Sequence, residues 1–403
     1  MLKVITCEKA LEIIKNEFKI INAGTESVSL AECLGRVLSE SIVSSESIPA
    51  FDRSTVDGFA VIASDTYGSS ESIPSQLDVI GEIPMGEKSS LTVNSGECVR
   101  ISTGGMLPCG CDSVVMVENT DTSFDNFALI YKSVSPFENV TKKGDDIKTG
   151  QTVFEKGRAL SSREIGALSC LGITRVNVYK KPRVGIISTG DEIIPAESEA
   201  VFGKIRDVNT HILSALVREL GCECVSYGII KDNYGDIYSA VKKAVSENDI
   251  VLISGGSSAG TRDMTADIIS SLGEVFFHGL SMKPGKPTIV GKIDNKAVFG
   301  LPGHPVAAYF VALRLISPLV SMVLGKSEKA VTLKGRLTQN ISSNHGREEI
   351  VCVRYADGEV SPVFGKSGVV SLLSEGDGYI IIDRNCEGLR SGEEVTVNLF
   401  QKG

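Results

Sequence analysis

Two lysines in a turn rich in proline and glycine are the first residues that could do chemistry. Lys283 and Lys286 stand in the segment MKPGKP and carry positive charges on flexible side chains. Pro302, Gly303 and Pro305 belong to a second turn, which lies between a short apolar run and a helical pattern. Because a helix N-terminus exposes N–H groups that bind anions, the turns and lysines together predict a site for a small anion.

A third turn follows the apolar run 250–253. Ser254 ends this run, and Gly255, Gly256 and Gly260 come after it. Glycine enters tight turns at little steric cost, so the stretch predicts a buried strand, a glycine turn and the start of a helix. Ordinary strand-to-helix turns without a ligand are the alternative interpretation. The coincidence of two such turns with the lysine pair favours the anion site.

Three acidic residues lie just past the ends of predicted strands. They are Glu192, Asp232 and Asp263. The carboxyl ends of parallel strands share one edge of a sheet, so we expect these carboxylates to converge there. A carboxylate close to a bound phosphate usually shares a divalent cation with it, and the three acids therefore predict a metal-assisted site.

The elements that must position these residues alternate between strand and helix. The predicted strands lie at 183–188, 224–230, 249–254 and 296–300, and the predicted helices at 209–220, at 236–245 and after Asp263. This alternation from 183 to 325 predicts a doubly wound α/β domain.

The flanking regions have different patterns. Residues 1–45 carry two helical patterns, the second opened by a capping box between Ser29 and Glu32, and residues 139–180 return to helix and linker character. Short apolar runs between glycine turns predict a small β unit up to about residue 140. Further such runs after residue 331 predict a closed or sandwiched β domain.

Polar turns in the β regions can be explained without a functional site. Asp57 and Thr103 each stand in a turn of the first β unit, where Asp and Ser/Thr often bond only to the local backbone, and the residues alone favour that interpretation. The segment FGKS, ending at Ser367, is similar to the end of a phosphate-binding P-loop. Val360 stands where that motif needs glycine, so we reject the P-loop.

The composition is that of a soluble globular protein. The 403 residues are 42% hydrophobic and 23% charged, and the net charge of −9 argues against a nucleic-acid binder. Ten cysteines without metal-ligand spacing, in a chain with no signal-like opening, predict reduced, mostly buried thiols and a cytoplasmic protein. Arg314 and Pro318 interrupt the apolar stretch 307–325, which favours a core helix over a membrane span.

With these pieces in place, the chain resembles the MoeA-type molybdopterin molybdenumtransferases, the family that includes the C-terminal domain of gephyrin. The resemblance spans nearly the whole chain in order. Its marks are FDRSTVDGFAV, RISTGGMLPCGCDSVVMVE, STGDEI, SGGSSAGTRD, MKPGKP, LPGHPVAA and SGVVSLLSEGDGYIII.

The resemblance implies an elongated homodimer whose chain combines α/β and β domains. The implied domains are a helical, discontinuous linker and dimerisation domain (1–45 and 140–178), an inserted β domain (46–139), a MogA-like α/β molybdopterin-binding domain (179–326) and a C-terminal β-barrel (327–403).

The family's reaction, by the same resemblance, inserts molybdate into the dithiolene of adenylylated molybdopterin with Mg²⁺-dependent release of AMP. Glu192 and Asp263 would hold the cation or orient the adenylyl phosphate. Lys283 and Lys286 would pair with phosphate or molybdate, and Asp57 completes the implied catalytic set. The implied substrate-binding residues are Thr103, Ser254, Gly255, Gly256, Gly260, Asp232, Pro302, Gly303, Pro305 and Arg347.

Several implied details are specific to this chain. Asp57 and Thr103 would reach the site from the β domain of the other subunit, which replaces their interpretation as plain turns, and Asp146 also matches a motif position. His304 stands where many family members carry Asn or Tyr. Gly279 stands where some carry a lysine, which predicts an anion site with fewer positive charges.

Three alternatives stay open at this point. The α/β domain alone resembles molybdopterin-adenylylating proteins, a gephyrin-like scaffold is a non-enzymatic alternative, and tungstate could replace molybdate. The expected partners are the adenylylating protein and acceptor molybdoenzymes, with no nucleic acid and no membrane.

Replacing Asp263 with Asn tests the acid site. Asp263→Asn keeps the shape of the side chain and removes its charge, so we expect turnover to be abolished while the fold stays intact. AMP release and circular dichroism measure the two properties. Wild-type turnover in this variant would contradict the assignment.

Overall fold

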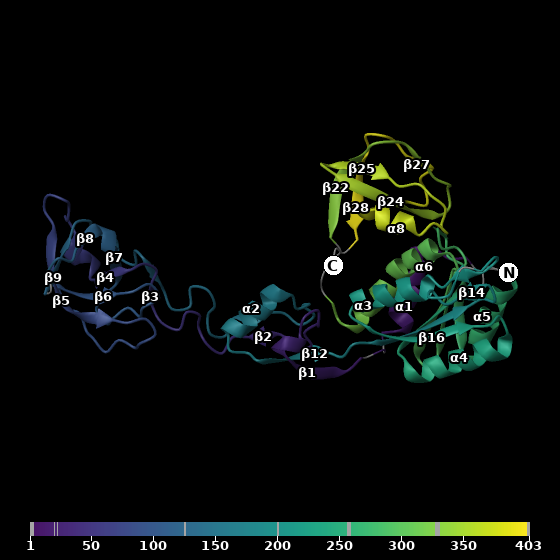
Figure 1. The fold of residues 1–403 in the computed structure, drawn as a ribbon, viewed down its shortest axis with the longest axis horizontal. Helices are drawn as coiled ribbons and strands as arrows, with labels where there is room; N and C mark the ends of the chain where they lie inside the picture. The colour runs from purple at the N-terminus through teal and green to yellow at the C-terminus, as the bar shows by residue number, and fades with distance from the viewer. Residues whose placement is uncertain are drawn as a thin grey trace. The chain divides into compact units, whose positions relative to one another are not determined.

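The chain forms two compact units (Figure 1). The structure, a computed structural model, describes residues 4–19, 21, 23–124, 126–199, 201–255, 259–326 and 331–400, with the backbone alone for 259–263. The larger unit comprises Met1–Glu40, Lys156–Ile165 and Thr174–Gly403. The smaller unit comprises Ser41–Glu155 and Gly166–Ile173.

A six-stranded sheet with the order β16–β13–β17–β21–β20–β18 is the centre of the larger unit. The first four strands are parallel, which confirms the α/β prediction, and β20 and β18 extend the sheet antiparallel. Its elements and close neighbours are β13 (Arg183–Thr189), β14 (Ile193–Ile194), β15 (Ile205–Arg206), α3 (Asn209–Glu219), β16 (Glu223–Ile230), α4 (Tyr234–Glu247), β17 (Ile250–Gly255), α5 (Ala259–Leu272), β18 (Glu274–His278), β19 (Met282–Lys283), β20 (Ile289–Ile293), β21 (Lys296–Leu301), α6 (Pro305–Val311) and α7 (Ser317–Val323).

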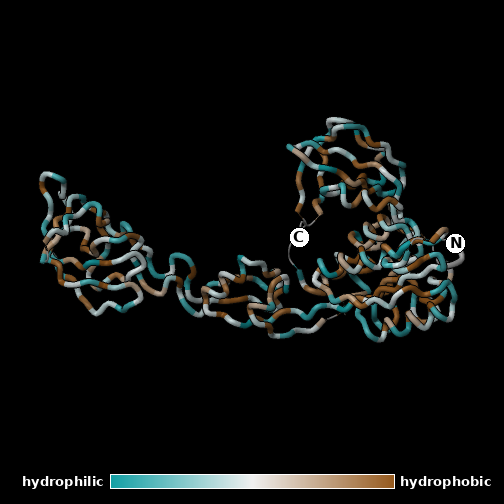
Figure 2. Tube along the Cα trace, viewed as in Figure 1, coloured by the Kyte–Doolittle hydropathy of each residue, from teal (hydrophilic) through white to brown (hydrophobic). Residues whose placement is uncertain are grey.

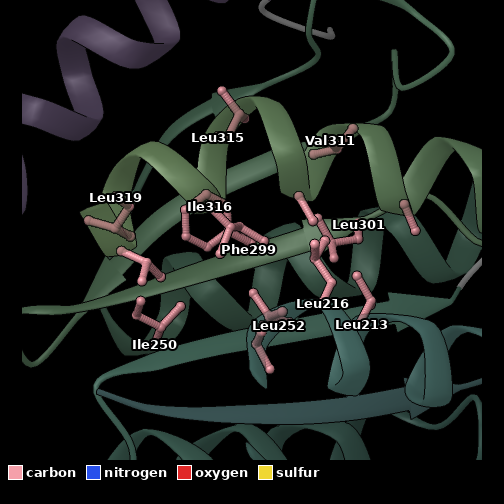
Figure 3. Close-up of a cluster of buried hydrophobic side chains, with 14 of the residues drawn as sticks. Leu213, Leu216, Ile250, Leu252, Phe299, Leu301, Val311, Leu315, Ile316 and Leu319 are labelled. Carbon is pink, nitrogen blue, oxygen red and sulfur yellow. The ribbon is translucent and has the colours of Figure 1, made fainter. Parts of the chain in front are cut away.

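Alternating side chains of β17 bury both faces of this sheet. Ile250 and Leu252 pack with residues of α3, α6 and α7, and Val251 and Ile253 pack with residues of α4 and α5. Figure 3 shows the first of these layers, between the sheet and the helix that carries Leu315. In Figure 2 hydrophobic stretches, coloured brown, lie in the middle of this unit. A strand buried on both faces reads as a continuous apolar run, and this explains why the sequence revealed it.

The apolar stretch after the second turn is a helix of the core. A π-helical segment, Ala312–Ile316, joins α6 to α7, so the helix continues through Arg314 and Pro318. Among the described residues, this helix (Pro305–Val323) alone is long and apolar enough to cross a membrane by length and composition. Within this helix, 61% of the apolar 18-residue stretch is buried inside the protein, which fits the predicted core helix.

The C-terminal region is a closed β-barrel, as expected. Strands β24, β25, β22, β28 and β26 pair in that order, and β26 pairs back with β24. The barrel also gains β19 from the α/β sequence, because β19 runs parallel to β24. Its elements are β22 (Thr332–Leu337), β23 (Ile341–Ser342), β24 (Glu348–Ala356), β25 (Glu359–Pro362), α8 (Ser371–Glu375), β26 (Gly378–Ile382), β27 (Gly388–Leu389) and β28 (Glu394–Leu399).

The N-terminal segment corrects one expectation. Helix α1 (Cys7–Glu17) forms, but the second predicted helix does not: β1 (Thr25–Ser29) pairs with β12 (Arg175–Tyr179) and is followed by a single 3₁₀ turn, Leu30–Glu32. The capping box is present, since the Glu32 carboxylate accepts from the Ser29 backbone N–H. Val37 and Leu38, which the helix would have contained, instead form bridges to Ala159 and to Val178 of β12, and these long-range contacts decided against the helix. The region 139–180, predicted to have helix and linker character, does contain a helix, α2 (Ser162–Cys170).

The smaller unit contains a six-stranded sheet with the order β7–β4–β6–β5–β9–β8, in agreement with the predicted β unit. Its apolar core includes Phe59, Leu77 and Val115. Its strands are β2 (Ile42–Val43), β3 (Arg53–Ser54), β4 (Gly58–Val61), β5 (Ser75–Ile83), β6 (Glu97–Ile101), β7 (Ser113–Met116), β8 (Thr120–Asp121), β9 (Phe127–Ile130), β10 (Val140–Thr141) and β11 (Thr152–Phe154).

Truncating Leu252 should destabilise the α/β sheet strongly. Its side chain is fully buried, and Leu252→Ala should lower the free energy of unfolding by about 3 kcal/mol because a cavity remains in the core. Urea denaturation followed by circular dichroism measures this change. Ile205→Ala, at a residue that is 59% exposed, is the control, and equal effects of the two substitutions would contradict the assigned core.

Candidate functional site

A pocket of about 950 Å³ contains both predicted lysines. It is lined by the turn 283–287, by the N-terminal end of α6 and by residues of the barrel. Four lining side chains are cationic: Lys283, Lys286, Arg347 and Lys366. Glu349 is the single carboxylate among the described residues that line it. This excess of positive charge suits an anion, as the sequence predicts for the lysine pair.

The pairing of β19 with β24 brings the lysine turn to the barrel. Lys283 lies opposite Glu349 in the register of these parallel strands. The Lys283 Nζ and the Glu349 Oε1 are 2.7 Å apart, and the Ser343 hydroxyl donates to Glu349 Oε2 at 2.8 Å. Both carboxylate oxygens of Glu349 therefore have a partner in the protein.

A second ion pair fixes the start of β24. The Arg314 guanidinium, in the π-helical segment, donates from Nε and Nη2 to the two carboxylate oxygens of Glu348 at 3.0 and 3.1 Å. The Glu348 N–H also donates to the Ser281 carbonyl at 3.0 Å. A bidentate Arg–carboxylate pair restricts orientation as well as distance, so it holds the residues on either side of Glu348, Arg347 and Glu349, at the pocket.

The rejected P-loop segment supplies pocket residues that the sequence reasoning missed. Lys366 and Ser367 line the pocket, and the Ser367 hydroxyl lies 3.0 Å from Nδ1 of His304. The Val306 N–H donates to the Ser367 carbonyl at 3.2 Å. The missed signal was the Lys-Ser pair itself, which can bind an anion outside a P-loop.

Two of the three predicted acids, Glu192 and Asp232, follow neighbouring strands at the carboxyl edge of the sheet, β13 and β16. Burial, together with the nearby charges of Glu192 and Asp191, raises the pKa of Asp232. One Asp232 oxygen, Oδ1, is buried without a hydrogen-bond partner. The third acid, Asp263, has a described backbone in α5 but its side chain lies outside the described residues.

The chemistry of these carboxylates fits a hard divalent cation. Mg²⁺ prefers carboxylate oxygens, and a cation beside Glu192 and Asp232 would relieve their mutual repulsion and give the buried Oδ1 a partner. Among the side chains that the structure describes, no group of three or more His, Cys, Asp or Glu could hold a metal ion. Glu192 and Asp232 could therefore supply only part of a ligand set.

Gly255 is required at the end of β17. Its φ of +145° lies in a region that favours glycine, and a Cβ there would come within 2.1 Å of the Thr189 carbonyl oxygen. The two strand ends can therefore approach closely only because this side chain is absent. Gly256, the next predicted residue, lies outside the described residues, and of Gly260 only the backbone is described.

Ser254 serves the turn at 302–305 and is not exposed to a ligand. It is fully buried, and its hydroxyl accepts from the Asn209 amide at 2.8 Å. The same amide nitrogen donates to the Gly303 carbonyl at 2.8 Å. Asn209, which the sequence reasoning did not single out, thus ties the end of β17 to the second turn. Pro302 lines the pocket, and Pro305 begins α6.

In the smaller unit, the structure brings Asp57 and Thr103 together. Asp57 Oδ1 accepts from the Thr103 backbone N–H at 2.7 Å and from its hydroxyl at 3.0 Å, and these bonds lower the pKa of Asp57. Asp146 is an exposed residue of the same unit. A role of these residues beside the α/β edge stays a prediction.

Gly279 and the cysteines complete the predicted features. The φ of Gly279 is +127°, so the lysine that some family members carry would be strained here. Every described cysteine is unpaired, and half of the ten are buried. Burial raises the pKa of Cys98 and Cys222 to about 12, as expected for unreactive structural thiols.

Comparison with known families covers most of the chain. Residues 5–172 match the family model "MoeA N-terminal region (domain I and II)". Residues 185–321 match "Probable molybdopterin binding domain", and residues 334–400 match "MoeA C-terminal region (domain IV)".

Curated relatives match over nearly their full length. A Methanocaldococcus jannaschii protein named for molybdopterin biosynthesis is 38% identical, with 96% of this chain and 95% of the relative covered. A molybdopterin molybdenumtransferase of Staphylococcus epidermidis is 32% identical, with 98% and 95% covered. A solved MoeA structure from Pyrococcus horikoshii is 34% identical, with a TM-score of 0.88 over 99% of this chain and 100% of that one.

Removing the charge of Asp232 should stabilise the protein. A carboxyl whose pKa is raised on folding binds its proton more readily in the folded state, so its contribution to stability falls as pH rises. Asp232→Asn should therefore raise the Tm at pH 7 by about 2 °C, and the gain should shrink as pH falls towards 4. Differential scanning calorimetry across this range measures it. A lower Tm at pH 7 would contradict the crowding of acids.

Proposed function

This chain belongs to the MoeA family, and from that premise we propose that it is a molybdopterin molybdenumtransferase that inserts molybdate into adenylylated molybdopterin and releases AMP. The observation that carries the proposal is the pocket lined by Lys283, Lys286, Arg347 and Lys366. The family accounts for a pterin and an oxyanion as substrates, and the pocket offers a place where an oxyanion can bind.

The cationic side chains would bind molybdate. Lys286, Arg347 and Lys366 bring three positive charges from the α/β domain and the barrel to one pocket. Charge-assisted hydrogen bonds to an oxyanion are stronger than hydrogen bonds between neutral groups, and Arg347 can offer two parallel donors. Ser367 would add a neutral donor, positioned by its contact with His304. These residues would hold the oxyanion while the pterin approaches.

The acids would act on the adenylyl phosphate. We place Mg²⁺ with Glu192 and Asp232, and with Asp263 by resemblance, because the crowded carboxylates and the unpartnered Asp232 oxygen suit a cation. When bound, Mg²⁺ would neutralise charge on the phosphate that is cleaved. The protein's own contribution is to hold these oxygens at the carboxyl edge of the sheet, the edge that also carries the turn at 302–305 that Asn209 ties to β17.

Other parts of the proposal rest on the resemblance. They are the homodimer, the cytoplasmic location, the four domain boundaries, transfer of the product to acceptor molybdoenzymes, and the contribution of Asp57 and Thr103 from a partner subunit. The matches to both MoeA regions outside the α/β domain favour the insertion step over an adenylylating role.

AMP release from adenylylated molybdopterin tests the function. We expect release by the purified protein to require both Mg²⁺ and molybdate. Lys286→Ala should raise the KM for molybdate at least about tenfold, because a charge-assisted bond is lost. Lys334→Ala, at a lysine outside this pocket, is the control and should change nothing. Pterin binding without AMP release would instead support a carrier or adenylylating role.

A further inference from the structure

Among the described residues that line the oxyanion pocket, four are cationic and one, Glu349, is a carboxylate. Glu349 lines the pocket together with Lys283, Lys286, Arg347 and Lys366. Its side chain is 12% exposed, whereas that of Lys283 is 47% exposed. A negative charge in a site that suits dianions opposes their binding, so its presence there needs a physical reason.

Glu349 already uses part of the charge and hydrogen-bonding capacity of Lys283, the lysine that an oxyanion would contact. Its Oε1 lies 2.7 Å from Lys283 Nζ, and its Oε2 accepts from Ser343 at 2.8 Å. A lysine ammonium has three N–H donors in all, and a carboxylate that takes one also cancels its charge. An oxyanion at Lys283 must therefore share or displace the Glu349 contact.

We propose that Glu349 sets the affinity of this pocket, because it competes with the bound oxyanion for Lys283. The inference rests on the proposed function, in which the oxyanion is molybdate. A substrate that must be passed on gains nothing from very tight binding, since uniform binding lowers KM without raising kcat. The competing carboxylate lets the pocket collect several cations without retaining the oxyanion.

A purely structural ion pair is the alternative, and it has a different consequence. If the Lys283–Glu349 pair served only to join β19 to β24, loss of the carboxylate charge would loosen Lys283 and weaken oxyanion binding. In that case the pocket would lose affinity when Glu349 is neutralised. If Glu349 competes with the oxyanion, the pocket gains affinity instead.

Glu349→Gln distinguishes the two. Glutamine keeps the shape and can still accept from Lys283, while the Ser343 hydroxyl can rotate to accept from the amide. We expect the Kd for molybdate, measured by calorimetry on the full-length protein, to fall roughly tenfold. The gain should shrink with added salt. The KM for molybdate should fall in parallel, with no rise in kcat.

The matched control is Glu394→Gln. Glu394 pairs with Lys334 at 2.8 Å on the same barrel, but neither residue lines this pocket. Its substitution should leave molybdate binding unchanged, and melting curves of both variants report on the fold. Unchanged or weaker binding by Glu349→Gln, with wild-type binding intact, would overturn the inference and leave the proposed function standing. No molybdate binding by wild type or variant would overturn both.

Discussion

Burial of β17 on both faces is the constraint on which the rest of the larger unit depends. Ile250 and Leu252 pack under one layer of helices, and Val251 and Ile253 pack under the other. The strand can then lie only in the middle of the parallel sheet, between β13 and β21. Its carboxyl end consequently meets theirs, and the absent side chain of Gly255 permits that approach. The acids and turns share an edge because the core requires it.

The pocket depends on a second, smaller contact. Two residues of β19 pair with β24, and the Arg314–Glu348 ion pair holds the start of the same strand. Together they place cations from segments far apart in the sequence around one volume. The π-helical segment that carries Arg314 is an irregularity of a kind that often marks functional sites, and here it supports the strand that brings Arg347 and Glu349 to the pocket.

The site contains two groups of like charges, one negative and one positive. Asp232 is crowded by Glu192 and Asp191, and the pocket's described lining residues include four cations and one carboxylate. Like charges repel in both arrangements, and the repulsion costs more at the partly buried Asp232 than at the exposed lysines of the pocket, where water screens it. Each would be relieved by a ligand of opposite charge: a divalent cation at the acids and an oxyanion at the lysines. The repulsion within each group of charges is thus what would favour binding of the proposed ligands.

The sequence by itself determined the local features and the class of the fold. Continuous apolar runs such as 250–253, helices with regular spacing and the Lys283–Lys286 turn are encoded within a few residues, and so are the segments that mark the family. Only the tertiary structure decided the features that depend on contacts between residues far apart in the sequence. The helix predicted after Ser29 did not form, because Val37 and Leu38 pair with Ala159 and Val178. Lys366 and Ser367 joined the pocket because the barrel carries them there. Glu349 is an ordinary strand residue in the sequence. Only the register of β24 against β19 sets it opposite Lys283, and no local pattern records a register between residues 66 positions apart in the sequence.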